Sequence, residues 1–221
     1  MERGYIRYYG STTNAELREL CGQWGVYSEF DFAGARCLPQ IYAAAGYQTR
    51  AMHSFTSNLF ERASWYPKLG FDRIEFAPEL ESAGVRGCGG LFPGACDDDV
   101  PRLIGERLKA AENPQFVYWL TLNSHLPVLP DPTLGTEPCT IGPADWREEL
   151  PEICRLFAVH RALADAIDQL AMDPALPPTD FLIVGDHVPA FFHREHRLRF
   201  DPNRVPWFLL RARDAADTTG A

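Results

Sequence analysis

Two side chains that can bind a divalent cation, Asp186 and His187, follow a short predicted strand after a single glycine. The predicted strand covers residues 180–184, and its unbroken apolar run over 181–184 is typical of a strand buried on both faces of a parallel sheet. In an open α/β sheet, ligands collect at the carboxyl ends of strands. A carboxylate oxygen beside an imidazole nitrogen suits a divalent cation. Taken alone, the pair has another interpretation, in which Asp186 caps a turn and His187 is a surface histidine.

Two further predicted strands also end on histidine. Residues 47–52 lead into His53, and residues 116–122 lead into a short polar segment that holds His125. Because parallel strands end at one edge of a sheet, we expect these histidines to lie near Asp186 and His187.

Thr12 precedes a predicted helix over residues 15–21 and could join this cluster. A helix N-terminus favours an anionic oxygen or a phosphate, so Thr12 is a candidate hydroxyl nucleophile. The structural alternative is that Thr12 is one of several residues there able to cap the helix.

Strands and helices alternate along the chain, which predicts an α/β fold with a mostly parallel sheet flanked by helices. Neither an internal repeat nor a convincing linker divides the sequence, so residues 1–221 are expected to form one domain. His160 falls within the apolar stripe of the longest predicted helix and is interpreted as a core histidine. Further helices are predicted over 37–45, 58–66, 101–112 and 148–172, further strands over 71–76 and 205–210, and loops over 83–99 and 127–143.

Charge argues against one class of partner for this stretch of sequence, and hydropathy argues against a membrane-spanning helix within it. A formal net charge of −9 argues against a non-specific nucleic-acid binder, which needs a basic surface. No apolar run approaches the roughly 20 residues of a membrane-spanning helix, and the first residues do not resemble a signal peptide.

The six cysteines fall as neighbouring pairs along the chain. Pairing of nearest neighbours is the simplest of many arrangements, and it favours an oxidising compartment outside the cytoplasm. Six free thiols in a cytosolic enzyme are the alternative, while zinc is disfavoured because no CxxC or HxxxH spacing occurs. The expected pairs are Cys21–Cys37, Cys88–Cys96 and Cys139–Cys154.

Four segments together resemble the extracytoplasmic phosphotransferases of the alkaline phosphatase and sulfatase superfamily, which include lipoteichoic acid synthases and phosphoethanolamine transferases. The segments are GSTTNAELRELCG, HSFTSNLFER, LTLNSHLPV and VGDHVPAF, and the resemblance extends over residues 8–210. It implies that Thr12 carries the transferred phospho group. It also implies metal binding by Thr12, Asp186 and His187, and substrate contacts by His53, Phe60, Arg62 and His125.

The resemblance further implies a divalent cation, zinc or manganese, and a phospholipid or glycan substrate. The phospho group would be of the phosphoethanolamine or phosphoglycerol type, transferred in two steps through Thr12. Either His53 or His125 could protonate the leaving alkoxide. The expected location is periplasmic or otherwise extracytoplasmic, at the inner membrane.

The chain departs from the family at two places. The family uses an acidic metal ligand on a strand ahead of the nucleophile, but here Glu2 lies in no apolar run. We therefore expect the chain to be the carboxyl-terminal part of a longer protein whose upstream region supplies that strand and a membrane anchor. Phe55 replaces a polar residue found in some relatives, which leaves the head-group preference open.

Two alternatives remain at this point. One is a catalytically impaired remnant that binds an anionic glycan or a partner. The other is a sulfatase-type ester hydrolase, although Cys37 to Ile41 departs at its last two positions from the C-x-P-S-R motif of sulfatases.

Overall fold

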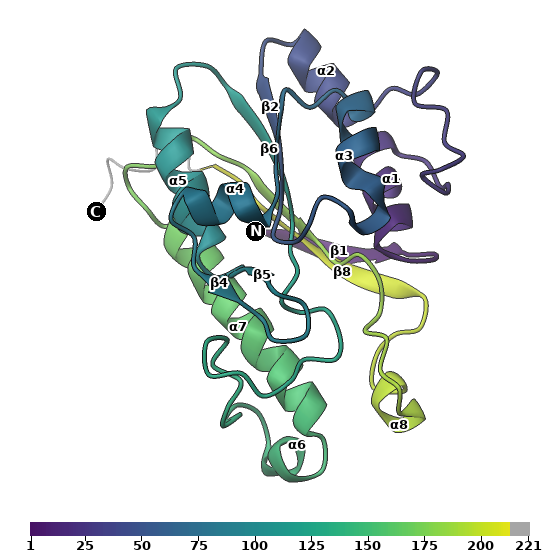
Figure 1. Ribbon diagram of the computed structural model, residues 1–221, viewed down its shortest axis with the longest axis vertical. Helices are drawn as coiled ribbons and strands as arrows, with labels where there is room; N and C mark the ends of the chain where they lie inside the picture. The colour runs from purple at the N-terminus through teal and green to yellow at the C-terminus, as the bar shows by residue number, and fades with distance from the viewer. Residues whose placement is uncertain (213–221) are drawn as a thin grey trace.

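The computed structural model of the protein describes residues 1–212 and places the strands between two groups of helices (Figure 1). Helices α1, α2 and α3 lie on one side, and α4, α5 and α7 lie on the other. The helices are α1 (Thr12–Cys21), α2 (Leu38–Ala44), α3 (Arg62–Trp65), α4 (Ala77–Ser82), α5 (Val100–Ala110), α6 (Ala144–Glu148), α7 (Pro151–Ala171) and α8 (Arg194–Arg197). The strands are β1 (Glu2–Arg7), β2 (Gln48–His53), β3 (Arg73–Glu75), β4 (Gly87–Cys88), β5 (Gly94–Ala95), β6 (Gln115–Leu120), β7 (Phe181–Val184) and β8 (Arg204–Leu210).

The parallel part of the fold is a three-stranded sheet in the order β3-β2-β6. In β2 and β6, Gln48 pairs with Gln115 and His53 pairs with Leu120, so the two strands end at the same level. Alternate residues of β6 enter different hydrophobic clusters, since Phe116 and Tyr118 pack on the α1 side and Val117 and Trp119 on the α5 side. The predicted α/β class, with parallel strands between helices, is confirmed.

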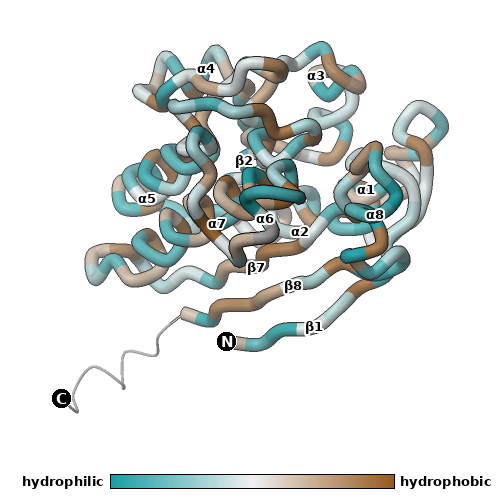
Figure 2. Tube along the Cα trace, turned by 90° about the horizontal axis from the view of Figure 1, so that it is seen from below, coloured by the Kyte–Doolittle hydropathy of each residue, from teal (hydrophilic) through white to brown (hydrophobic). Residues whose placement is uncertain are grey.

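The strand before Asp186 has a different setting from the one predicted. β7 pairs antiparallel with β8, and β8 pairs antiparallel with β1, in a separate three-stranded sheet of order β1-β8-β7. Figure 2 shows these strands side by side along one margin of the molecule, with β1 outermost. Leu182 is 63% exposed, so the apolar run of β7 is not buried on both faces as its sequence suggests. An apolar run cannot by itself reveal the direction or presence of its neighbours.

Two predicted helices differ from their predicted bounds, and one of them is interrupted. The one predicted over 58–66 is replaced by a 3-10 turn (Leu59–Glu61), the short helix α3 and a second 3-10 turn (Tyr66–Leu69). Phe60 and Glu61 have positive φ values of 55° and 52°, which break the helical path. The helix predicted over 148–172 begins only at Pro151, where proline is suited to the first turn. The predicted loop over 83–99 contains the hairpin formed by β4 and β5.

The predicted disulfides are confirmed, because the structure contains Cys21–Cys37, Cys88–Cys96 and Cys139–Cys154. The first joins the end of α1 to the residue before α2, and the second closes the β4–β5 hairpin. Within residues 1–212, no helix combines the length and the apolar character that a membrane crossing requires.

Candidate active site

Thr12 is the first residue of α1, so its hydroxyl lies where the backbone N–H groups of the helix are unpaired. Ser11 precedes the helix in an extended conformation, and its backbone N–H donates to Oδ1 of Asn14 at 2.9 Å. This contact fixes the entry of the chain into the helix. The side chain of Thr12 is half-buried, and it is directed across to the segment that follows β7.

Asp186 and His187 meet Thr12 there, as the sequence predicts. The Thr12 hydroxyl donates to Oδ2 of Asp186 at 2.9 Å and lies 3.2 Å from Nε2 of His187. His187 Nε2 and Asp186 Oδ2 are 3.2 Å apart. These three atoms, from segments more than 170 residues apart in sequence, form a compact triangle.

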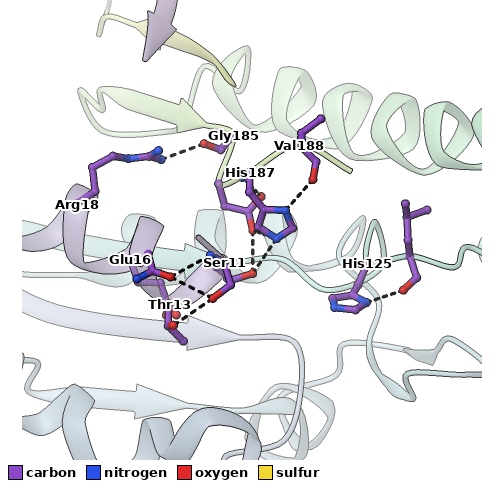
Figure 3. A network of polar contacts seen from close by, with 12 residues as sticks. Ser11, Thr13, Glu16, Arg18, His125, Gly185, His187 and Val188 are labelled. Carbon is purple, nitrogen blue, oxygen red and sulfur yellow. Dashed lines mark hydrogen bonds and ion pairs between the residues drawn. The ribbon is translucent and has the colours of Figure 1, made fainter. Parts of the chain in front are cut away.

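Hydrogen bonds outside the triangle orient its members. His187 Nδ1 lies 2.8 Å from the Val188 carbonyl, so it carries the proton and leaves the Nε2 lone pair facing the triangle (Figure 3). Arg18, one and a half turns after Thr12 on α1, donates from Nη2 to the carbonyl of Gly185 at 3.0 Å. That bond fixes α1 to the segment that carries Asp186.

The triangle has the dimensions of a cation site. Tetrahedral ligands about 2 Å from a metal ion are about 3.3 Å from one another, close to the spacing of these atoms. The Nε2 lone pair of His187 and the Asp186 carboxylate face each other, an arrangement that a positive charge between them stabilises. In the described part of the chain no cluster holds three or more His, Cys, Asp or Glu residues suited to a metal, so a cation site at this position would have to include the Thr12 hydroxyl.

A further carboxyl group, that of Glu19, interacts with the charge of Asp186. Burial raises the pKa of Glu19 to about 7, and the charges of Asp186 and Glu16 add to this effect, while the ion pair with Arg18 opposes it. Because burial is the larger cause, the shift reports mainly the loss of solvent around Glu19.

His53 lies beneath the surface. Its side chain is 3% exposed, and Nδ1 lies 3.1 Å from the carbonyl of Leu120 in the neighbouring strand. Burial lowers the pKa of His53 to about 3, and the nearby charge of Arg62 lowers it too. The imidazole is therefore neutral near pH 7, so the suggestion that His53 protonates a leaving alkoxide is not supported by its surroundings.

Arg62 also lies in the interior, where its partner is Glu16 of α1. Its Nη2 and the Glu16 carboxylate are 2.8 Å apart, and both side chains are 1% exposed. Its Nη1 donates to the carbonyl of Leu59 at 3.2 Å, and the Tyr66 hydroxyl donates to Glu16. Burial would lower the pKa of Arg62, but the Glu16 carboxylate outweighs that effect and raises it. The guanidinium predicted to contact substrate thus forms a buried ion pair in this structure.

Phe60 and His125 are both accessible. Phe60 is 40% exposed and lies against the guanidinium of Arg62, 5.3 Å from ring centre to carbon. His125 is exposed, and its Nδ1 lies 2.9 Å from the carbonyl of Leu126, which leaves Nε2 free (Figure 3). The structure thus brings Thr12, Asp186 and His187 into contact, and places Phe60 and His125 at the surface without a hydrogen bond to them.

The sequence did not single out Glu16 and Arg18, the residues that hold α1 in place. Glu16 anchors Arg62, and Arg18 bonds the carbonyls of Arg7 and Gly185. The only signal in the sequence was that both are charged residues of the predicted helix, four and six positions after Thr12. Charged residues that face solvent on a helix give the same signal.

Comparison with known proteins identifies the relatives of this arrangement. The Sulfatase family model matches residues 8–217. The lipoteichoic acid synthase LtaP from Listeria monocytogenes superposes with a TM-score of 0.72 at 16% identity, over 97% of this chain and 58% of that chain. The Streptococcus pyogenes phosphoglycerol transferase GacH, in complex with sn-glycerol-1-phosphate, gives a TM-score of 0.64 at 16% identity, over 94% of this chain and 58% of that one.

A protein of the alkaline phosphatase superfamily from Vibrio parahaemolyticus gives a TM-score of 0.68 at 15% identity, over 93% of this chain and 50% of that chain. The chain thus spans only about half to three fifths of the length of these three structures. No curated protein matches the sequence.

Proposed function

Because the chain belongs to the sulfatase family, we propose that it is an enzyme domain that transfers or hydrolyses a phospho group. The observation that carries the proposal is the convergence of the Thr12 hydroxyl, the Asp186 carboxylate and Nε2 of His187 within 2.9–3.2 Å. A hydroxyl nucleophile beside a carboxylate and an imidazole at a helix N-terminus suits attack on an anionic phosphorus centre.

Each of these side chains has a role in the proposed reaction. Oγ1 of Thr12 attacks phosphorus, and the bond from phosphorus to the first leaving group breaks, which leaves the phospho group on Thr12. The Asp186 carboxylate is placed to accept the threonine proton. An acceptor hydroxyl or water then attacks the same phosphorus and releases Thr12. His125, exposed and with Nε2 free, is the histidine placed to exchange a proton with a substrate oxygen.

Thr12, Asp186 and His187 would hold a divalent cation, with zinc and manganese both suited to this mixed oxygen and nitrogen set. When bound, it would lower the pKa of the Thr12 hydroxyl and neutralise charge on the phosphoryl oxygens. Asp186 alone contributes an anionic ligand, so the affinity of this triangle for a cation is expected to be modest.

The substrate class is part of the proposal. A phosphoglycerol or phosphoethanolamine group on a lipid or glycan is supported by the fold shared with LtaP and GacH, whose names include lipoteichoic acid synthase and phosphoglycerol transferase. The disulfides support an oxidising compartment outside the cytoplasm.

A longer, membrane-anchored polypeptide is also proposed, and the open sheet edges support one part of this proposal, an additional strand. β6 and β7 each lie at the edge of a three-stranded sheet, and no strand within residues 1–212 pairs with the free edge of either. Val117 and Trp119 of β6 and Phe181 of β7 pack against one hydrophobic cluster, so the two edges border the same interior space. We propose that a strand outside residues 1–221 occupies this space and ends near Thr12.

The test is hydrolysis of a model phosphodiester, bis(p-nitrophenyl) phosphate, by the protein extended to include that strand. Thr12→Ala should abolish turnover, and the phospho group should be found on Thr12 by mass spectrometry after rapid quenching. Chelation with EDTA should remove activity, and added Mn²⁺ or Zn²⁺ should restore it. Turnover that survives Thr12→Ala would refute the proposed nucleophile, and selective cleavage of sulfate esters would favour a sulfatase.

A further inference from the structure

The turn that carries His125 is held by a buried carboxylate from another part of the chain. Asp97 follows strand β5 and is 2% exposed. Its Oδ2 accepts the backbone N–H of Leu122 at 2.8 Å and that of Asn123 at 2.6 Å. Two consecutive amides just after the end of β6 therefore point at one oxygen atom, which fixes the direction in which the chain leaves the sheet.

The contact is reciprocal. Oδ1 of Asn123 accepts the backbone N–H of Asp97 at 2.8 Å, and Asn123 is 7% exposed. The turn then closes when the backbone N–H of His125 donates to the carbonyl of Leu122 at 2.8 Å. The position of His125 is thus set by hydrogen bonds to Leu122 and Asn123, three and two residues earlier in the chain, and not by its own side chain.

A second contact reaches His125 from the same segment. Phe92, in the loop between β4 and β5, lies with its ring centre 4.4 Å from that of His125. Phe92 lies in the loop of the hairpin that the Cys88–Cys96 disulfide closes, and Asp97 is the residue directly after Cys96. The hairpin is also anchored to the sheet, because Ala95 donates from its backbone to the carbonyl of Ser54 at 2.9 Å. His125 therefore rests on a small, cross-linked support.

We infer that Asp97 is a positioning residue that sets the orientation of His125 through the amides of Leu122 and Asn123. The geometry requires an acceptor here, since Asp97→Ala would remove the carboxylate and leave the buried N–H groups of Leu122 and Asn123 unpaired. Such a turn would rearrange, and the exposed imidazole would lose its direction. The consequence for turnover rests on the proposed role of His125, but the effect on its orientation does not.

The orientation is measured without any activity assay. In residues 1–221 labelled with ¹³C-histidine, the His125 ring signal is identified by its loss in His125→Ala. Asp97→Ala should shift or broaden this signal, whereas Asp97→Asn should leave it nearly unchanged, because an amide oxygen can still accept both N–H bonds. Asp98→Ala is the matched control, since Asp98 is partly exposed and pairs with Arg86 instead.

If Asp97→Ala does not fold, Asp97→Glu provides the same test. It keeps the charge but moves the carboxylate by one methylene group, and it should displace the His125 signal while Asp97→Asn does not. An unchanged His125 signal in a folded Asp97→Ala or Asp97→Glu protein would overturn the inference.

Turnover provides the second readout, in the extended protein. Asp97→Ala should lower kcat/KM about 10- to 100-fold. Combined with His125→Ala it should lower kcat/KM no further than His125→Ala alone, because Asp97 acts through His125. A further drop in the double variant would show a merely structural role. If Thr12→Ala retained activity, the proposed function would fail, but the ring-signal test of Asp97 would stand.

Discussion

At the scale of single residues, burial decides which of the candidate side chains can meet a substrate. Arg62 and His53 lie in the family-like segment that the sequence marked for substrate contact, yet both are nearly inaccessible. Arg62 completes an ion pair with Glu16, and His53 is kept neutral by its surroundings. Their contribution in this structure is to hold α1 and β2 in place around the Thr12 triangle.

We predict that Arg62→Met lowers the free energy of unfolding by about 3–5 kcal/mol, because it leaves the Glu16 carboxylate buried without its partner. Glu16→Met combined with Arg62→Met should recover part of this loss. Urea denaturation gives both values. The control is Arg102→Met, whose ion pair with Glu106 is 50% and 52% exposed and should change stability by less than about 1 kcal/mol. Loss of turnover with unchanged stability would instead favour a substrate contact for Arg62.

His53 should make stability depend on pH. Its pKa is about 3 in the folded protein, below the ordinary value of 6.5, so folding favours the neutral imidazole. Below pH 6.5 the unfolded chain binds a proton on His53, whereas the folded protein does not bind it until about pH 3. The stabilisation is therefore complete above pH 6.5 and is lost as the pH falls from 6.5 towards 3. Between about pH 7.5 and about pH 4, we expect a loss of about 3 kcal/mol from this group.

The measurement is the free energy of unfolding of the wild type minus that of His53→Gln, taken across this pH range. The difference removes contributions from other groups, including Asp97, whose pKa burial raises to about 6 and whose effect has the opposite sign. The comparison variant is His125→Gln, at an exposed position. Parallel curves for wild type and His53→Gln would contradict the prediction.

At the scale of elements, α1 connects the parts of the fold. Its first residue contacts the segment after β7, Glu16 anchors the α3 region, and Arg18 bonds the carbonyls of Arg7 and Gly185. Leu17 and Leu20 pack in the cluster that also includes Ala51 of β2. The helix therefore contacts segments of both sheets, and Thr12 at its first residue lies beside the segment that follows β7.

The disulfide at the end of this helix should contribute measurably. Cys21 and Cys37 are separated by 16 residues, and a cross-link of that span contributes about 3 kcal/mol in the chain-entropy model. We predict that Cys21→Ala with Cys37→Ala lowers the free energy of unfolding by about this amount, as measured by guanidinium denaturation. Addition of a reductant should then affect the double variant less than the wild type, and equal effects on both would argue against this contribution.

At the scale of the whole molecule, two three-stranded sheets lie under shared helical layers, and β6 and β7 border the space between them. All six residues of β6 are only partly buried, although five of them are apolar, and Leu182 of β7 is largely exposed. Exposed apolar strand edges associate with other chains. The proposed additional strand would bury these edges.

We therefore predict that residues 1–221 alone turn over phosphodiesters feebly and self-associate, and that the extended protein is active and less prone to association. Initial rates and size-exclusion chromatography with light scattering provide the comparison. Hydrogen exchange at β6 and β7 amides should be slower in the extended protein. Robust Thr12-dependent activity from residues 1–221 would refute this part of the proposal, and one defined dimer joined at these edges would identify a second copy as the occupant.

The sequence by itself determined the α/β class, the segments that meet at the site and the pairing of the cysteines. Local order carries this information: Asp186 and His187 end an apolar run, Thr12 begins a helix, and each disulfide joins cysteines at most 16 residues apart. The Thr12 triangle was predictable from this local order, although the strand before Asp186 lies in a separate antiparallel sheet and not in the parallel one that the prediction assumed.

Only the tertiary structure decided the direction of β7 and the burial of Arg62 and His53. It also decided the hydrogen bonds from the turn before His125 to Asp97. Each depends on a partner far along the chain, such as β8 for β7 or Glu16 for Arg62. An arginine looks the same in the sequence whether its side chain faces a phosphate or a buried carboxylate. Its accessibility and its nearest charge are set by packing, and therefore no spacing in the sequence specifies them.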